Sequence, residues 1–207
     1  MTRPMLEALD LVGIRGEHRL FDHLTFRIAP GECLLVQGEN GNGKTTLLRS
    51  LAGFATPDAG RVLWKGKPLR NQWSEYQREL VYSGHGIGLK EDLNALDNLL
   101  AAAAIAGEPL TPERVESALD DVGLTEHRHL PVRMLSQGQK RRASLARLLL
   151  YKRKLWILDE PSTALDKFGA RWLGEVIHGH QSRGGMVVLT SHQELAVKAS
   201  QTVRMGA

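Results

Sequence analysis

Residues 5–28 hold two apolar-rich runs, 5–12 and 20–28, separated by the polar segment IRGEH. Leu24, Phe26 and Ile28 stand at every second position, which predicts a strand with one buried face over residues 20–28. An apolar-rich run over residues 5–12 predicts another strand before it. Two early strands of this kind indicate a small antiparallel sheet beside a parallel core.

Three compact apolar runs in the rest of the chain lack this alternation. They span residues 32–37, 155–158 and 186–190. Uninterrupted apolar runs of this length are typical of strands that are buried on both faces, as in the parallel sheet of an α/β domain. Shorter apolar runs over residues 61–64 and 80–83 predict two more strands.

Helical patterns fill much of the remaining chain. Residues 94–105 are rich in Ala and Leu, and residues 112–122 begin with a proline and stop before Gly123, as helices commonly do. An amphipathic segment rich in Arg, Ala and Leu continues to Tyr151, and residues 167–182 predict a further helix.

Strands on both sides of a helical block indicate one α/β domain with an insertion. We expect a core of about residues 1–84 and 151–207, in which a mixed sheet has a parallel centre and antiparallel N-terminal strands. The inserted helical subdomain would cover about residues 85–150. A chain of 207 residues is long enough for one well-packed domain of this kind and too short for two full domains.

Composition narrows the class of protein. Hydrophobic residues make up 42% of the chain and charged residues 24%, which is typical of a folded domain. The one cysteine, Cys33, allows no disulfide within the chain and fits a reducing compartment. No apolar run approaches the roughly 20 residues that span a bilayer, and the first residues lack the apolar segment of a signal peptide. We therefore expect a protein that is neither embedded in a membrane by itself nor exported by that route.

The net charge of +4 leaves two interpretations open. Basic residues gather at 140–142 and 152–154, which could suit nucleic acid or an anionic membrane surface. A positive excess this small is more often a solvated face. We expect no nucleic-acid partner.

Residues 38–46, GENGNGKTT, match the pattern G-x-x-x-x-G-K-[ST] between a predicted strand and a predicted helix. Glycines there can take positive φ, so that backbone N–H groups converge on phosphate oxygens at the positive end of the helix. Lys44 would bridge the terminal phosphates, and the Thr45 hydroxyl suits Mg²⁺, a hard cation. The expected phosphate-binding residues are Gly38, Glu39, Asn40, Gly41, Asn42, Gly43, Lys44, Thr45 and Thr46. The sequence therefore predicts a nucleoside triphosphate as ligand.

Four further features follow the phosphate loop in a fixed order. Residues 135–139 read LSQGQ, the apolar run 155–158 ends in an Asp-Glu pair, residues 162–166 read STALD, and His192 follows the last buried run. In this order the sequence resembles, over essentially its whole length, the nucleotide-binding subunit of ABC transporters. The resemblance implies a P-loop NTPase fold of ABC type, and it is far more specific than the phosphate loop alone.

The resemblance implies a role for each of these residues. Asp159 would hold Mg²⁺ through its water shell, and Glu160 would be the general base that polarises the attacking water. His192 would contact the γ-phosphate and the base. Lys44 completes the expected catalytic set.

The LSQGQ segment implies a second copy of the chain. Ser136, Gly138 and Gln139 match the ABC signature, which in this family reaches the γ-phosphate of the nucleotide bound by the other subunit. Asp166 resembles the loop that couples the two sites. The resemblance thus implies ATP and Mg²⁺ as ligands, held in a head-to-tail pair of subunits that closes on two ATP molecules.

Two positions depart from the family pattern. His85 stands where the family usually carries a glutamine, and Arg15 stands where an aromatic residue usually stacks on adenine. A neutral imidazole can accept or donate a hydrogen bond, so His85 is a candidate metal contact. A guanidinium plane can stack on a base, so Arg15 is the expected contact to adenine.

Within the ABC family, several local sequences resemble the ATPase subunit of the cytochrome c maturation system. They are RVLWKGKPL, GHGIGLKEDLNALDNLL, SQGQKRRASLARLLL and LWILDEPSTALD. This narrower resemblance implies a peripheral protein on the cytoplasmic face of the bacterial inner membrane, with an integral membrane subunit of the cytochrome c maturation complex as partner. Its ATP hydrolysis would drive release of haem-loaded chaperone, a function also named haem export. The sequence has no C-x-x-C-H motif, so we expect no direct haem ligand.

Two rival interpretations leave parts of this pattern unexplained. A soluble ABC protein that acts on nucleic acid usually carries two such units or long coiled-coil insertions, and neither is present. An unrelated phosphate-loop kinase or GTPase would give LSQGQ and His192 no task, and the guanine-reading motif N-K-x-D is absent. An ABC ATPase for another cargo is the remaining alternative.

Overall fold

Nine strands form two separate sheets in the computed structural model, which describes residues 5–191 and 197–206. The antiparallel sheet has the order β2 (His18–Ile28), β1 (Leu6–Arg15), β4 (Ala59–Trp64) and β5 (Lys67–Pro68). The parallel sheet has the order β6 (Leu80–Ser83), β7 (Leu155–Leu158), β8 (Met186–Thr190), β3 (Cys33–Gln37) and β9 (Gln201–Arg204).

The α/β class with a parallel core and antiparallel N-terminal strands is confirmed. The antiparallel strands belong to a sheet of their own, since none of them is hydrogen-bonded to a strand of the parallel sheet. The sequence patterns did not predict β9, whose four residues are alternately half-buried and exposed and form no compact apolar run.

The chain divides into two compact units. The sheet unit consists of Met1–Gly84, Arg153–Pro161 and Gly174–Ala207, and the helical unit consists of His85–Lys152 and Ser162–Leu173. The helical unit therefore includes a segment that follows the Asp-Glu pair, in addition to the insertion expected from the sequence.

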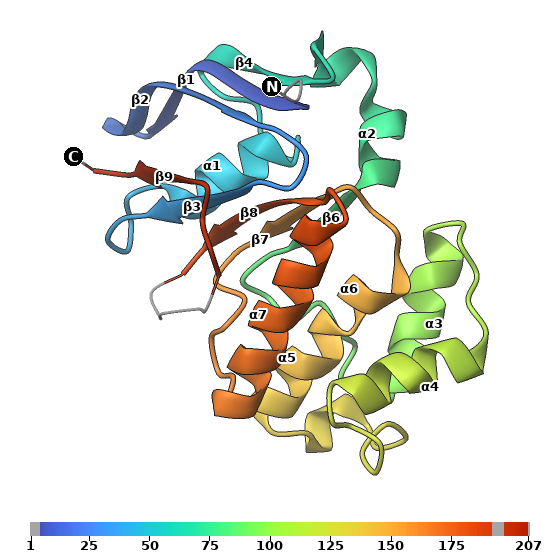
Figure 1. Ribbon diagram of the computed structural model, residues 1–207. Helices are drawn as coiled ribbons and strands as arrows, with labels where there is room; N and C mark the ends of the chain where they lie inside the picture. Colours follow the sequence, from blue (N-terminus) through green and yellow to red (C-terminus); the bar gives the residue numbers. More distant parts are fainter. Residues whose placement is uncertain (1–4, 192–196, 207) are drawn as a thin grey trace. The chain divides into compact units, whose positions relative to one another are not determined.

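The core of the sheet unit lies between its two sheets. Helix α1 (Lys44–Leu51) runs between them in Figure 1, and its leucines Leu47, Leu48 and Leu51 are fully buried. Both sheets contribute to the same cluster, for example through Leu6 of β1 and Val188 of β8. At about 25 cal/mol per Å² of apolar surface, this burial is the main stabilising contribution to the unit. A 3₁₀ turn (Leu69–Asn71) and helix α2 (Trp73–Glu79) join β5 to β6.

The helical unit has its own apolar cluster. The unit contains α3 (Ala95–Ile105), α4 (Pro112–Asp121), the 3₁₀ turn Val132–Met134, α5 (Gln137–Leu145) and α6 (Arg147–Leu150), and the cluster packs between these helices. Helix α7 (Lys167–Ser182) begins in this unit and ends in the sheet unit.

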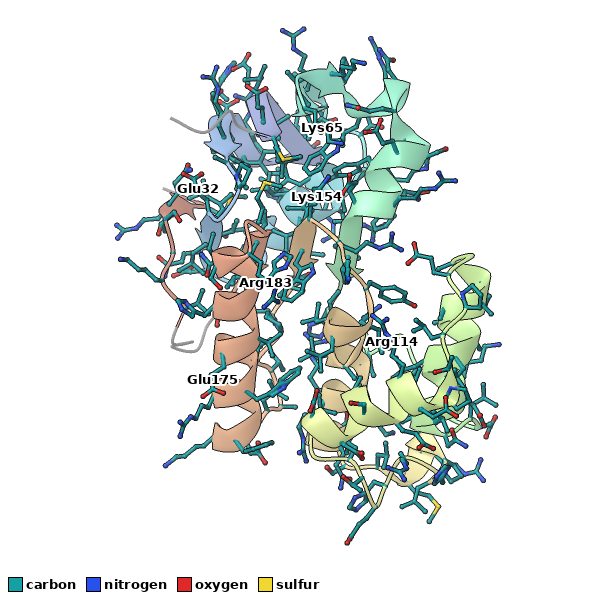
Figure 2. The ribbon with its side chains drawn as sticks, turned by 45° about the vertical axis from the view of Figure 1, so that its right-hand side comes forward. Glu32, Lys65, Arg114, Lys154, Glu175 and Arg183 are labelled. Atoms are coloured by element: carbon teal, nitrogen blue, oxygen red, sulfur yellow. The ribbon has the colours of Figure 1, made fainter. Side chains whose placement is uncertain are left out.

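The amphipathic segment that leads to Tyr151 forms two helices, α5 and α6, which meet at Ala146; the backbone of Ala146 stays in the right-handed helical region, with φ −54° and ψ −27°. Arg114 of α4, labelled in Figure 2, donates from Nη2 to the Leu150 carbonyl at 2.9 Å, and this bond satisfies a carbonyl at the end of α6. No helix among the described residues is both long enough and apolar enough to cross a membrane.

A buried histidine packs on the parallel sheet of the sheet unit. The His180 ring of α7 stacks on Trp156 of β7, with ring centroids 3.7 Å apart and planes 2° apart. Gly185 leaves room for it, since a Cβ there would lie 2.2 Å from the ring. Burial, and then the charge of Arg183 after the end of α7 (Figure 2), lower the pKa of His180 to about 4. The ring is therefore neutral in the folded protein at neutral pH.

This histidine makes stability depend on pH in a predictable direction. Between pH 6.5 and 4 the unfolded chain binds a proton at His180 that the folded chain does not bind, so the free energy of unfolding falls as the pH falls. We expect His180 to account for a loss of at most about 3 kcal/mol across this window. Urea unfolding at a series of pH values measures it. His180→Phe keeps a ring on Trp156 but cannot titrate, so its unfolding free energy should fall less than that of the wild type; parallel pH profiles would contradict the assignment.

Candidate functional site

Three strands of the parallel sheet bring the phosphate loop and the Asp-Glu pair to one edge of that sheet. Val36 of β3 is paired with Thr190 of β8, and Leu158 of β7 is paired with Leu189 of β8. The phosphate loop follows β3, and Asp159 follows β7. Because parallel strands end at the same edge of a sheet, these segments meet at the carboxyl end, where α/β proteins bind their ligands.

The phosphate loop has the backbone that its glycines allow. Gly38, Gly41 and Gly43 have φ values of 152°, 91° and 80°, and Gly43 is the N-cap of α1. The first N–H groups of α1 therefore face the loop, at the positive end of the helix dipole. A Cβ on Gly43 would lie 2.6 Å from the Leu20 Cβ of β2, which shows how closely the antiparallel sheet approaches the loop.

The Lys44 side chain binds the backbone of its own phosphate loop. Its side chain is buried, and Nζ donates to the Gly38 carbonyl at 2.7 Å and to the Glu39 carbonyl at 3.0 Å. The ammonium is thereby held within the loop. A compact point charge in this place is suited to bind phosphate oxygens.

Asp159 is the centre of the hydrogen bonds at this edge. Only 2% of the residue is exposed. Its Oδ2 accepts from the Thr45 hydroxyl at 2.7 Å, and its Oδ1 accepts from the Thr190 hydroxyl at 2.8 Å. Burial raises the pKa of the phenol of Tyr82 in β6, and the nearby Asp159 carboxylate raises this pKa further. The carboxylate is therefore fixed in orientation by two hydroxyls from two different segments.

Glu160 has an unusual backbone. Its φ is 48°, in the left-handed region, which costs a residue other than glycine about 1–2 kcal/mol. Its N–H donates to the Thr190 hydroxyl oxygen at 2.8 Å. Pro161 follows directly.

The donors at this edge fit Mg²⁺ that arrives with a nucleotide. Thr45 and Asp159 provide a hydroxyl and a carboxylate, the hard oxygen ligands that this ion prefers. Within residues 5–191 and 197–206, no group of three or more His, Cys, Asp or Glu side chains could hold a metal ion alone. Mg²⁺ does not need such a group, because it usually keeps several waters and binds one or two protein ligands together with phosphate oxygens.

The signature residues lie in the helical unit, at the start of α5. Ser136 and Gln139 form a capping box: the Ser136 hydroxyl accepts from the Gln139 N–H at 3.2 Å, and Gln139 Oε1 accepts from the Ser136 N–H at 2.8 Å. Gly138 lies against the chain after the Asp-Glu pair, since a Cβ there would be 2.9 Å from the Ala164 carbonyl. Asp166 Oδ1 accepts from the Gly169 N–H at 2.7 Å and thereby caps α7.

The remaining predicted site residues are spread over the chain. Arg15 is exposed at the end of β1, where it pairs with His18 in the hairpin to β2. His85 is exposed and is the first residue of the helical unit. His192 lies outside the described residues. Thr190 is a site residue that the sequence patterns did not single out; a threonine that ends an otherwise wholly apolar strand was the available signal.

A phosphate loop after β3, an Asp-Glu pair after β7 of the same sheet and a capped signature helix together define an ATP-binding cassette. The sequence profile described as ABC transporter matches residues 21–163. A protein of Pyrococcus furiosus, described as an ABC transporter ATP-binding protein, has a similar structure, with a TM-score of 0.82 at 26% sequence identity over 97% of this chain and 96% of that chain.

Two relatives are far more similar in sequence. The cytochrome c biogenesis ATP-binding export protein CcmA 1 of Cupriavidus metallidurans is 89% identical over 207 residues, which is 100% of both chains. The protein CcmA of Pseudomonas aeruginosa is 89% identical over 203 residues, which is 98% of this chain and 100% of that one. The chain belongs to the ABC transporter family, and within it to the CcmA group of cytochrome c biogenesis ATP-binding export proteins. It is an ABC-type ATPase that binds ATP.

The close contact between Gly43 and Leu20 gives a prediction with a matched control. Gly41 also has a positive φ, but a Cβ there would meet nothing within 4 Å. Gly41→Ala should therefore lower the unfolding free energy by backbone strain alone, about 1–2 kcal/mol. Gly43→Ala adds the clash and should cost at least about 1 kcal/mol more. Urea unfolding of the nucleotide-free proteins measures the difference, and equal losses would show that Leu20 yields without cost.

Proposed function

We propose that this chain is the ATP-hydrolysing subunit of a membrane complex for cytochrome c maturation, in which ATP hydrolysis drives release of a haem-loaded chaperone. The full-length identity of 89% to a cytochrome c biogenesis ATP-binding export protein is the observation that carries this assignment. The hydrogen bonds around Asp159 support the hydrolytic part. The subunit would bind peripherally to an integral membrane partner at the cytoplasmic face of the bacterial inner membrane.

The geometry supports a division of roles within the sheet unit. Lys44 and the N–H groups at the start of α1 would hold the phosphates, with Gly38–Thr46 forming the cradle. Thr45 and Asp159 would hold Mg²⁺, which when bound neutralises charge on the β- and γ-phosphates. Water would then attack the γ-phosphorus as the bond to the bridging oxygen breaks, giving ADP and phosphate. Glu160 would orient that water and accept its proton.

The second half of each site would come from another copy of the chain. Ser136 opens α5, so its hydroxyl and the first N–H groups of the helix lie at a positive helix end that suits an anion. Gly138 and Gln139 belong to the first turn of the same helix and would contribute to this anion site.

Three further contacts are proposed. His192, beyond the strand β8 that ends at Thr190, would contact the γ-phosphate. His85 would contact the metal, and Arg15 would contact the adenine.

No part of this role requires the subunit to bind haem. Cys33 of β3 is 1% exposed, and burial raises the pKa of its thiol to about 12. A thiol that stays protonated and buried offers no thiolate to haem iron. We propose that the subunit supplies the work of hydrolysis and that haem stays with its partners.

Replacing Glu160 by Gln should separate ATP binding from hydrolysis. In the complex with its membrane partner, Glu160→Gln should keep nucleotide affinity, lower kcat by about 100-fold or more, and cause haem-loaded chaperone to accumulate in cells. Glu126→Gln, an exposed carboxylate in the helical unit, is the matched control and should behave like the wild type.

The two readouts test different parts of the proposal. Unchanged turnover in Glu160→Gln would remove the general-base assignment. Lost turnover with normal haem handling would keep the ATPase mechanism and leave an ABC ATPase for another cargo.

The paired-subunit arrangement is tested at Ser136. Ser136→Ala removes the helix cap at a cost of about 1 kcal/mol and adds no bulk. Ser136→Arg removes the same cap and places a long cation where the partner's nucleotide would bind. We expect ATP binding to the single chain to be unchanged in both variants, whereas turnover of the complex should fall at least about tenfold further in Ser136→Arg than in Ser136→Ala. Full turnover in Ser136→Arg would favour an unrelated phosphate-loop enzyme.

A further inference from the structure

Thr190 occupies a position where an apolar residue would be expected. It is the last residue of β8, whose sequence is MVVLT, and all five residues of this strand are buried. Thr190 itself is 0% exposed. A hydroxyl that is buried so completely is costly unless it is hydrogen-bonded, and valine would fill nearly the same space without that cost. The hydroxyl therefore needs an explanation in terms of its partners.

The partners of the hydroxyl determine the direction of each hydrogen bond. The Glu160 N–H can only donate, so the Thr190 oxygen accepts from it at 2.8 Å. The hydroxyl proton is then free to donate to Asp159 Oδ1 at 2.8 Å. One side chain thus binds the carboxylate of the first acidic residue and the backbone of the second.

The bond to Asp159 fixes which oxygen faces the phosphate loop. Oδ1 is bound by Thr190, and Oδ2 is bound by the Thr45 hydroxyl at the start of α1. The bond from the Thr190 hydroxyl restrains rotation of the carboxylate about its Cβ–Cγ bond. It thereby helps to keep Oδ2 aligned with the Thr45 hydroxyl.

The bond to Glu160 acts on the backbone. Glu160 has a φ of 48°, a conformation that a residue other than glycine keeps only when surrounding contacts hold it. The N–H of Glu160 is the group that Thr190 binds. This bond therefore helps to determine the direction in which the Glu160 side chain leaves the backbone.

We propose that Thr190 is a positioning residue that aligns Asp159 and Glu160 through one buried hydroxyl, and this inference rests on the proposed ATPase function of the site. Thr190 touches neither the water nor the phosphates in this role. It acts through the carboxylate of Asp159, which is proposed for Mg²⁺, and through the backbone of Glu160, whose carboxylate is proposed for the attacking water. The role belongs to the hydroxyl, so serine can retain it and valine cannot.

The test compares Thr190→Val, which keeps the volume and loses the hydroxyl, with Thr190→Ser, which keeps the hydroxyl. Ser83→Ala is the matched control, because Ser83 ends β6, the strand on the other side of β7 from β8, and its buried hydroxyl has no hydrogen-bond partner among the described residues. Three quantities are measured: hydrogen exchange of the Glu160 amide by NMR, the Kd of ATP with and without Mg²⁺, and kcat of the membrane complex.

In Thr190→Val we expect the Glu160 amide to exchange about tenfold faster or more, because its acceptor is lost. The affinity gained by adding Mg²⁺ should fall by about tenfold, while the Kd of ATP without Mg²⁺ stays within about twofold of the wild type. The value of kcat should fall by about 10- to 100-fold. Thr190→Ser and Ser83→Ala should stay close to the wild type in all three measurements.

Several results would overturn the proposal. They are wild-type values in Thr190→Val, equal losses in Thr190→Ser and Thr190→Val, or an equal loss in Ser83→Ala. If Thr190→Val does not fold, Thr190→Ala replaces it, with the same expected contrast to serine. Amide exchange and Mg²⁺-dependent binding need no turnover, so a wild-type complex without ATPase activity would refute the proposed function while these two measurements still decide the role of Thr190.

Discussion

Burial of the Asp159 carboxylate is the constraint on which the site depends. A charge that is 2% exposed must be compensated by hydrogen bonds, since an unpaired buried carboxylate costs several kcal/mol. The hydroxyls of Thr45 and Thr190 supply two of these bonds. Because these threonines belong to α1 and β8, the carboxylate can be satisfied only when β3, β7 and β8 are in register.

The parallel sheet supplies that register. β8 lies between β7 and β3, so its last residue reaches the residues that follow both neighbours. A shift of the register by one residue would turn Thr190 to the opposite face and leave an apolar side chain beside the carboxylate. The buried strands are apolar at every position except at this edge. The same packing that stabilises the sheet unit thus determines where its few buried polar groups meet.

Much of the fold could be predicted from the sequence because its signals are local. The uninterrupted apolar runs gave β7 and β8 with their observed bounds, and the phosphate-loop pattern requires a strand before it and a helix after it. β9 could not be predicted in this way, because it is held by backbone bonds to β3 and has no buried run of its own. Separation of the antiparallel strands into their own sheet also depends on tertiary contacts, which no local pattern reports.

The site residues, too, could be predicted only where a local sequence motif identifies them. Gly38, Gly41 and Gly43 could be identified because a motif demands their backbone, and the structure gives all three positive φ. Thr190 belongs to none of the sequence motifs of the site, and its importance appears only when β8 is placed next to β7. The left-handed backbone of Glu160 was likewise unpredictable, since glutamate has no preference for positive φ.

The chain passes between its two units close to the ends of strands β6 and β7. The chain passes from the sheet unit to the helical unit after Gly84, one residue beyond β6, and again after Pro161, one residue beyond Glu160. Two of the covalent links between the units are therefore placed at the carboxyl edge of the parallel sheet, where β6 and β7 end side by side. Glu160 lies two residues before Ser162, the first residue of the returning helical-unit segment. Anchoring of the Glu160 amide by Thr190 thus fixes the chain at the point where it leaves the sheet unit.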